Sequence, residues 1–157
     1  MRKGSELYNS LGIRGSMSDK IDRLKHANAV LRAMGSHGRR FFYSEKNDRF
    51  SELVIDAGGR VRLIDDYTGK HVWLDKNGRW RGFSHGGTCR AIVEDLARYV
   101  RTGKPTRNHF GPWPEWICDG DLWGYGDAAE KVRADIKGNP AVTKMKSGDA
   151  ERWTYEP

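Results

Sequence analysis

The side chains best suited to bind a ligand or take part in a reaction lie in one short segment. It runs from Arg79 to Thr88 and reads RWRGFSHGGT. Two glycines there separate an expected strand from an expected helix, and backbone amides at such a junction can bind a phosphate or a carboxylate. Three arginines would add positive charge: Arg79, Arg81 and Arg90. The simpler alternative is that Gly86 and Gly87 let the chain turn while Thr88 caps the helix, which is a general need of helices.

Ser84 and His85 in this segment raise the question of a hydrolase, because a His-Gly-Gly run occurs in some oxyanion loops. The G-x-S-x-G elbow that would present a nucleophilic serine is absent from the sequence. A Walker loop, a G-x-G-x-x-G fingerprint and an H-E-x-x-H pair are absent as well. One further set could be imagined around a metal, but its spacings match no standard site: His85, His109, Cys118 and Asp119. We therefore expect no catalytic residues, no metal and no cofactor.

Adjacent carboxylates at Asp65 and Asp66 could in principle perform acid–base chemistry. They lie at a turn-like position, however, as do Asp119 and Asp121. Aspartate in a turn usually hydrogen-bonds to the nearby backbone. We interpret these carboxylates as parts of the local structure.

A mixture of arginine and tryptophan on the expected strands is the second candidate binding site. Its members could form one sheet face that stacks bases and binds phosphates: Arg60, Arg62, Trp73, Arg79, Trp80 and Arg81. The RNP motif of RNA-recognition sheets is absent from the sequence. The alternative is that Trp73 and Trp80 belong to the core, since tryptophan is highly buried on average, and that the arginines are solvated.

The composition limits the class of protein. The chain has 157 residues, a hydrophobic fraction of 37% and a formal net charge of +7. It fits one compact domain whose positive field would help attract nucleic acid, acidic proteins or anionic lipid. With only Cys89 and Cys118, no disulfide framework is expected, and a reducing intracellular compartment fits best. No apolar stretch suits a membrane span or a secretory signal.

The first sixteen residues look foreign to the rest, because Gly15-Ser16 directly precedes Met17 as a cloning scar precedes a native start. We interpret residues 1–16 as a disordered leader added by cloning. They carry three basic residues and one acidic residue, so the remaining chain keeps a net charge of +5. Residues 17–140 would then form a single α+β domain, followed by a polar tail over residues 141–157.

The spacing of apolar residues predicts a helix, a short strand and then a sheet. The helix is expected over residues 19–34, capped by Ser18 and stopped by Gly35. A short aromatic strand is expected at residues 40–43. Four strands of an antiparallel meander should follow, at residues 50–56, 60–65, 71–75 and 79–83, with glycine-containing turns between them.

A second helix between Thr88 and Gly103 is the most regular element. Its apolar residues recur at helical spacing: Cys89, Ile92, Val93, Leu96, Ala97 and Val100. This helix should lie across one face of the sheet, because an isolated meander needs such cover. An ordered aromatic loop over residues 105–125 and a third helix over residues 128–137 complete an α+β fold.

Parts of the chain resemble small uncharacterised proteins encoded by bacteriophages and prophages. The stretch from Tyr67 to Lys104 carries the resemblance through YTGK, GRWRGFSHGGT and RTGK, and a later LWGYG run adds to it. The resemblance covers most of residues 38–140 and implies an accessory protein of a mobile element in the bacterial cytoplasm. Such proteins often bind and block a host component, for example a defence nuclease.

The resulting expectation is a non-catalytic protein that binds a host protein or nucleoprotein, with counter-defence inhibition as the implied role and no membrane partner. Two alternatives stay open. The first is direct nucleic-acid binding through the Arg/Trp sheet face, with an affinity that falls steeply with salt. The second is an enzyme that uses Ser84 or His85, which requires a cleft and a carboxylate that orients the histidine.

Overall fold

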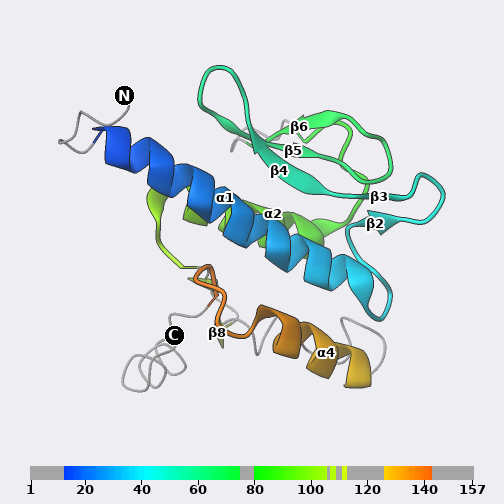
Figure 1. Cartoon of the computed structure of the whole chain (residues 1–157). Coiled ribbons are helices and arrows are strands. Elements are labelled where there is room, and N and C mark those ends of the chain that lie inside the picture. Colours follow the sequence, from blue (N-terminus) through cyan, green and yellow to red (C-terminus); the bar gives the residue numbers. More distant parts are fainter. Residues whose placement is uncertain (1–12, 75–79, 106, 109–110, 113–125, 143–157) are drawn as a thin grey trace.

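The computed structural model describes residues 13–74, 80–105, 107–108, 111–112 and 126–142. It combines helices with antiparallel strands (Figure 1), which confirms the expected α+β class. The elements follow in this order: α1 (Ile13–Ser36), β2 (Tyr43–Ser44), β3 (Arg49–Phe50), β4 (Glu52–Ile55), β5 (Val61–Ile64), β6 (His71–Trp73), α2 (Gly87–Thr102), β7 (Arg107–Asn108), β8 (Gly111–Pro112) and α4 (Gly126–Ile136).

The central sheet is a meander of β4, β5 and β6, in that spatial order. Its register places Leu63 of β5 between Leu53 of β4 and Val72 of β6. All three side chains are buried. Because side chains alternate between the two faces of a strand, these residues define the inner face of the sheet, against which the core is built.

The inner face packs on a pair of helices. In Figure 1, α1 and α2 lie side by side below the sheet, and α4 lies against α1 on the far side. Helix α1 contributes buried residues at helical spacing: Ala27, Val30, Leu31 and Met34. The apolar stripe expected from Cys89 to Val100 is buried on α2, which confirms that prediction. Ala141 and Val142 are also buried, so the core extends beyond residue 140.

One side chain of α1 covers an edge of the sheet. The Asn28 amide donates to the Leu53 carbonyl at 3.0 Å and accepts from the Leu53 amide at 2.7 Å. It therefore takes the place of a neighbouring strand at the middle of β4. This satisfies backbone groups that an edge strand would otherwise leave unpaired.

The first helix begins earlier than expected, and neither the predicted cap nor the predicted stop has that role. Helix α1 begins at Ile13, so Ser18 lies inside it, and the last four residues of the supposed leader are helical. Gly35 does not stop the helix either. It is buried within the last turn, where a Cβ atom would lie 2.7 Å from the Phe50 ring, so the glycine allows close packing rather than chain reversal.

Two predicted strands are also wrong. Residues 40–43 do not form one, because Arg40 and Phe42 have φ values of 54° and 68°, in the left-handed region. The chain bends there, Phe42 enters the core, and β2 begins only at Tyr43, paired with β3. Among residues 79–83, the described part turns at Gly82 (φ 89°) instead of pairing, so the described meander has three strands rather than four.

The later elements agree better with expectation. Helix α2 ends at Thr102, and the φ of 82° at Gly103 gives the left-handed cap that was predicted. Helix α4 matches the expected third helix. Most of the aromatic loop lies outside the described residues, as does the Asn77-Gly78 turn. Within the described part of the chain, no helix is long and apolar enough to cross a membrane.

Candidate functional site

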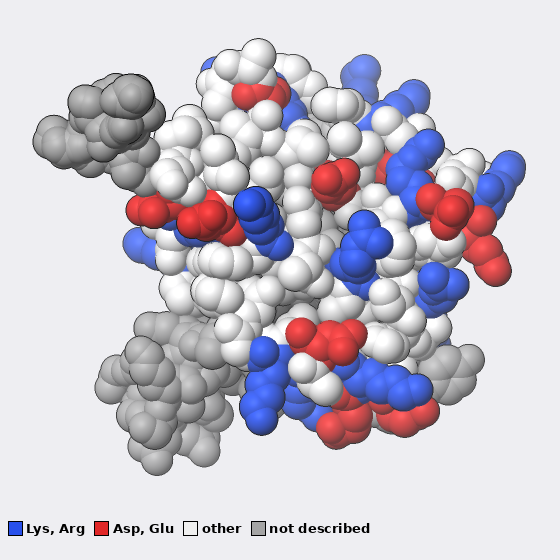
Figure 2. Space-filling model, in the orientation of Figure 1, with Lys and Arg blue, Asp and Glu red and all other residues white. Residues whose placement is uncertain are grey.

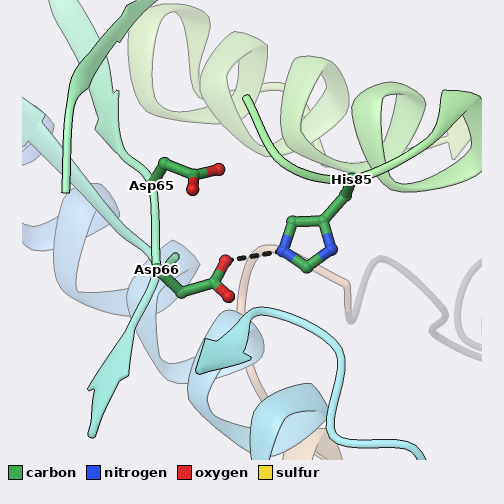
Figure 3. A group of neighbouring side chains, drawn as sticks. All are labelled: Asp65, Asp66 and His85. Carbon is green, nitrogen blue, oxygen red and sulfur yellow. Dashed lines mark hydrogen bonds and ion pairs between the residues drawn. The ribbon is translucent and has the colours of Figure 1, made fainter. Parts of the chain in front are cut away.

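Two aspartates and a histidine meet where β5 ends and α2 is about to begin. Asp65 and Asp66 directly follow β5, and His85 lies in the loop that leads into α2. Figure 3 shows the Asp66 carboxylate directed at the imidazole, with His85 Nε2 and Asp66 Oδ1 2.5 Å apart. We call this group, together with Ser51 and Ser84, the Asp–His junction. It joins segments that lie 19 residues apart in sequence.

Asp65 is the most extensively bonded member of the junction. Its Oδ2 atom accepts from the amides of Tyr67 and Thr68 and from the Thr68 hydroxyl, at 2.8–3.2 Å. Its Oδ1 atom accepts from the amide and hydroxyl of Ser84, at 2.8 and 3.0 Å. The side chain is fully buried. The expected turn role of Asp65 is therefore confirmed, and the same carboxylate also ties the turn to the loop before α2.

Asp66 links three parts of the chain through a buried carboxylate. Its Oδ1 atom accepts a 2.6 Å hydrogen bond from Ser51, while its own amide donates to the Ser51 hydroxyl. Burial alone would raise the pKa of Asp66. The hydrogen bonds from His85 and Ser51 outweigh that effect and hold the pKa below its ordinary value, so the folded state favours the carboxylate.

Two aromatic rings contact the imidazole of His85. Phe42 and Phe83 lie 5.1 and 5.5 Å from its ring, and its side chain is 17% exposed. Behind the junction, burial raises the pKa of the Cys89 thiol to about 12, and the Asp66 charge adds to the effect. Cys89 is thus an inert core thiol rather than a nucleophile.

The junction has some features of a catalytic triad but lacks an activated nucleophile. A carboxylate orients His85, as the enzyme alternative requires. However, no hydroxyl among the described residues reaches the second ring nitrogen, Nδ1. The two nearby serines instead donate to carboxylates, Ser84 to Asp65 and Ser51 to Asp66. In this arrangement a serine is not prepared to attack a substrate.

A metal is the other chemistry that this group could offer. One ligand atom from each of Asp65, Asp66 and His85 lies within 4.8 Å of the other two. A metal would need the lone pairs that these oxygens now share with serine, threonine and backbone donors. Binding would therefore dismantle the contacts that hold the loop, and the donor set fits a structural hydrogen-bond network better than a metal site.

The beginning of α2 differs from the expected capped junction. The N-cap residue is Gly86, without any side-chain cap, and Thr88 lies inside the helix, so its assignment as the cap is wrong. Gly86, Gly87 and Thr88 are exposed. A Cβ atom on either glycine would meet nothing within 4 Å. The loop is held by Asp65 and Asp66 through Ser84 and His85, and the exposed first turn of the helix leaves its free amides open to water.

The outward-facing side of the sheet is the second candidate region. By register and alternation its members are Glu52, Val54, Arg62, Ile64, His71 and Trp73, which we call the outer face. Trp73 is 45% exposed. Its cross-strand partner Arg62 places its guanidinium carbon 3.4 Å from the centre of the indole ring. Arg62 also forms a 3.0 Å ion pair with Asp56.

The other predicted residues of the Arg/Trp face differ in their burial. Trp80 is buried in the core, which confirms the alternative interpretation for that residue, and Arg90 lies over its ring at 4.8 Å. Arg60 and Arg81 are exposed. Arg79 lies outside the described residues. Among the five described residues of the six expected on one Arg/Trp face, Arg62 and Trp73 are the pair that the structure brings into contact.

Fold and site together describe a small α+β protein with a structural polar junction and one exposed tryptophan on its sheet. The sequence model of the YoqU family matches residues 17–144, so the chain belongs to the YoqU family. This membership confirms the resemblance to prophage proteins that the sequence suggested.

One curated relative is the SPbeta prophage-derived uncharacterized protein YoqU of Bacillus subtilis (strain 168). It is 30% identical over 88 residues, which make up 55% of this chain. The matched region spans 63% of the relative's own length. No solved structure matches the chain.

Proposed function

We propose that this prophage-family protein is a non-catalytic binding module that engages a host protein through the outer face, with Trp73 as the anchor. The observation that carries the proposal is the half-exposed indole stacked on Arg62. Tryptophan and arginine are the residues most enriched among those that dominate binding energy at interfaces. The host target that the prophage origin suggests is a component of bacterial defence.

The surroundings of Trp73 suit a protein partner. Val54 and Ile64 are half-buried neighbours on the same face, while Glu52 and His71 are exposed around them. An interface of this kind combines an apolar centre with a polar rim. The Arg62 guanidinium restricts the indole before binding, so less conformational entropy is lost when a partner covers it.

The charges near the outer face favour a protein over nucleic acid. The Arg62 charge is already paired with Asp56, and Glu52 adds a negative charge to the same face. On the side of the molecule shown in Figure 2, basic and acidic side chains alternate without forming a broad basic patch. A sequence-independent nucleic-acid site needs several unpaired cations along the backbone path.

Affinity capture with matched variants tests the proposal. Wild-type protein, Trp73→Ser and Tyr67→Ser are immobilised and exposed to Bacillus subtilis lysate, with and without nuclease, and bound proteins are quantified by mass spectrometry. Tyr67 is the control because it is 52% exposed but lies in the turn after β5. We expect a host protein that wild type and Tyr67→Ser retain and that Trp73→Ser retains at least about tenfold less.

Two results would overturn this function. Equal capture by Trp73→Ser and wild type would remove the outer face from the interface. Loss of capture after nuclease treatment, together with binding of oligonucleotides that weakens steeply with salt, would assign the face to nucleic acid instead.

A further inference from the structure

The half-exposed indole of Trp73 is held by a chain of contacts that begins in the turn between β4 and β5. Arg62 places its guanidinium carbon 3.4 Å from the centre of the indole ring, within stacking distance. The same guanidinium donates from Nε to Asp56 Oδ2 at 3.0 Å. Asp56 lies directly after β4, whereas Arg62 and Trp73 lie on β5 and β6. The Asp56 carboxylate therefore reaches the anchor residue through one intermediate side chain.

The two oxygens of Asp56 have different partners. Its Oδ1 atom accepts from the backbone amides of Gly58 and Arg60, at 2.8 and 2.9 Å, and its Oδ2 atom accepts from Arg62. The Arg60 amide holds the pKa of Asp56 below its ordinary value. The Gly58 amide and the Arg62 charge act in the same direction, although burial opposes them. Asp56 is therefore a carboxylate at neutral pH, with one oxygen bonded to the turn and the other to Arg62.

The turn that carries Asp56 is itself fixed to the rest of the fold. The Asp56 amide donates to the Arg60 carbonyl, and the Gly59 amide donates to the Asp56 carbonyl, both at 2.9 Å. From α1, Lys20 Nζ donates to the Gly59 carbonyl at 2.7 Å. An arginine side chain carries much rotamer entropy, so it needs a fixed acceptor to stay in one place. Asp56 supplies such an acceptor to Arg62.

We infer that Asp56 is a positioning residue of the Trp73 binding site and that it acts through Arg62. Its carboxylate keeps the Arg62 guanidinium against the indole and leaves the rest of the half-exposed ring to a partner. The stacked arrangement orders the ring before binding, which lowers the conformational entropy that association costs. The effect on affinity rests on the proposed function, whereas the positioning itself is a property of the free protein.

Two variants separate the positioning role of Asp56 from its role in the turn. Asp56→Asn keeps a side-chain oxygen for the amides of Gly58 and Arg60, but it turns an NH₂ group toward the Arg62 donor. Arg60→Gln is the matched control, because Arg60 is an exposed arginine of the same turn that bonds Asp56 through its backbone. If Asp56→Asn does not fold, Asp56→Ser keeps a hydroxyl acceptor for the turn and gives the same readout.

The readout in the free, isotope-labelled full chain is the NMR shift of the Arg62 Cδ protons. Protons beside the face of an aromatic ring resonate upfield, and Trp73→Ser gives their position without the indole. We expect Asp56→Asn to move these signals most of the way toward that position, because the guanidinium loses its fixed acceptor. Arg60→Gln should leave them where they are in wild type.

Affinity for the captured host protein is then measured for the same variants, after thermal unfolding shows that each is folded. Asp56→Asn should bind about fivefold more weakly, as expected when one long side chain loses its order, and Arg60→Gln should bind as wild type does. Unmoved Arg62 signals in Asp56→Asn would overturn the positioning role. So would an unchanged affinity of Asp56→Asn while Trp73→Ser binds weakly. Equal binding by Trp73→Ser and wild type would instead overturn the proposed function, and the Arg62 signals would still decide the positioning.

Discussion

Strand β5 connects two polar regions that are built in opposite ways. After its last residue, Asp65 and Asp66 are buried and bonded to serine, threonine, histidine and backbone donors. Near its start, Arg62 lies on the outer face under the half-exposed ring of Trp73. The first region contains residue types that suggest chemistry, and the second contains few.

The difference teaches that a side chain's role depends on its hydrogen bonds more than on its residue type. Side chains with all hydrogen bonds filled hold the fold together, and those with unused contacts can bind a partner. A buried carboxylate whose lone pairs are filled holds segments together and has little left for a ligand. A large aromatic ring left half in solvent has unused contact area. We therefore interpret the junction as a structural element, and the outer face is the surface that we propose for binding.

Removal of Asp65 should produce the largest effect on the junction side. Asp65→Ala removes the buried acceptor that binds the donors of Thr68 and Ser84, so we expect a loss of about 3 kcal/mol or more in the free energy of unfolding. Urea denaturation measures it. If Asp65→Ala does not fold, Asp65→Asn keeps the shape and should lose about 1–2 kcal/mol. Glu52→Ala, an exposed control on the sheet, should stay within about 0.5 kcal/mol.

The Asp66 carboxylate should make the junction sensitive to acid. Its pKa is lower in the folded protein than its ordinary value of 3.8, so the charged form stabilises the fold. That contribution is fully present above about pH 4 and is lost as the pH falls through the folded pKa. At pH 7, Asp66→Asn should be about 2 kcal/mol less stable than wild type.

Denaturation of Asp66→Asn and wild type between pH 7 and pH 3 checks this dependence. The stability difference between the two proteins should shrink in the acidic part of the range. A difference that stays constant with pH would mean that the carboxylate charge contributes nothing to the junction.

Trp73 should have the smallest effect on stability. Its ring is half exposed, and Trp73→Ser removes contacts mainly with Arg62, so the free energy of unfolding should fall by less than about 1 kcal/mol. Urea denaturation beside wild type measures the change. A loss as large as that of Asp65→Ala would show that the outer face is part of the stabilising core, and the comparison between the two regions would fail.

Much of the fold follows from periodicity. The apolar stripe from Cys89 to Val100 predicted α2 and its buried face, because its residues recur at the spacing that places them on one side of a helix. The other elements were harder to predict, because they depend on local backbone geometry. Propensity did not reveal the left-handed φ values of Arg40 and Phe42, or the turn at Gly82 that buries Trp80. Gly35 suggested a helix end, yet its reason is the Phe50 ring, which is distant in sequence.

The candidate site was predictable only where its contacts are local. The bonds of Asp65 to Tyr67 and Thr68 follow from the turn chemistry of aspartate. The pairing of Asp66 with His85 depends on how β5 and the loop before α2 come together, and no spacing in the sequence signals it. Likewise, Arg62 and Trp73 were expected on one face, but only the register of β5 and β6 places them in contact.

The most direct test of these two roles, a structural junction and a binding outer face, is an affinity measurement. The captured host protein is purified, and its affinity is measured for wild type, Trp73→Ser and Asp66→Asn. All three proteins are compared at pH 7, where the fold of each is verified first. We predict that Trp73→Ser weakens binding by about thirtyfold or more, as expected for an anchor residue, and that Asp66→Asn stays within about threefold of wild type. Full affinity in Trp73→Ser together with lost binding in folded Asp66→Asn would contradict the account and place the functional site at the Asp–His junction.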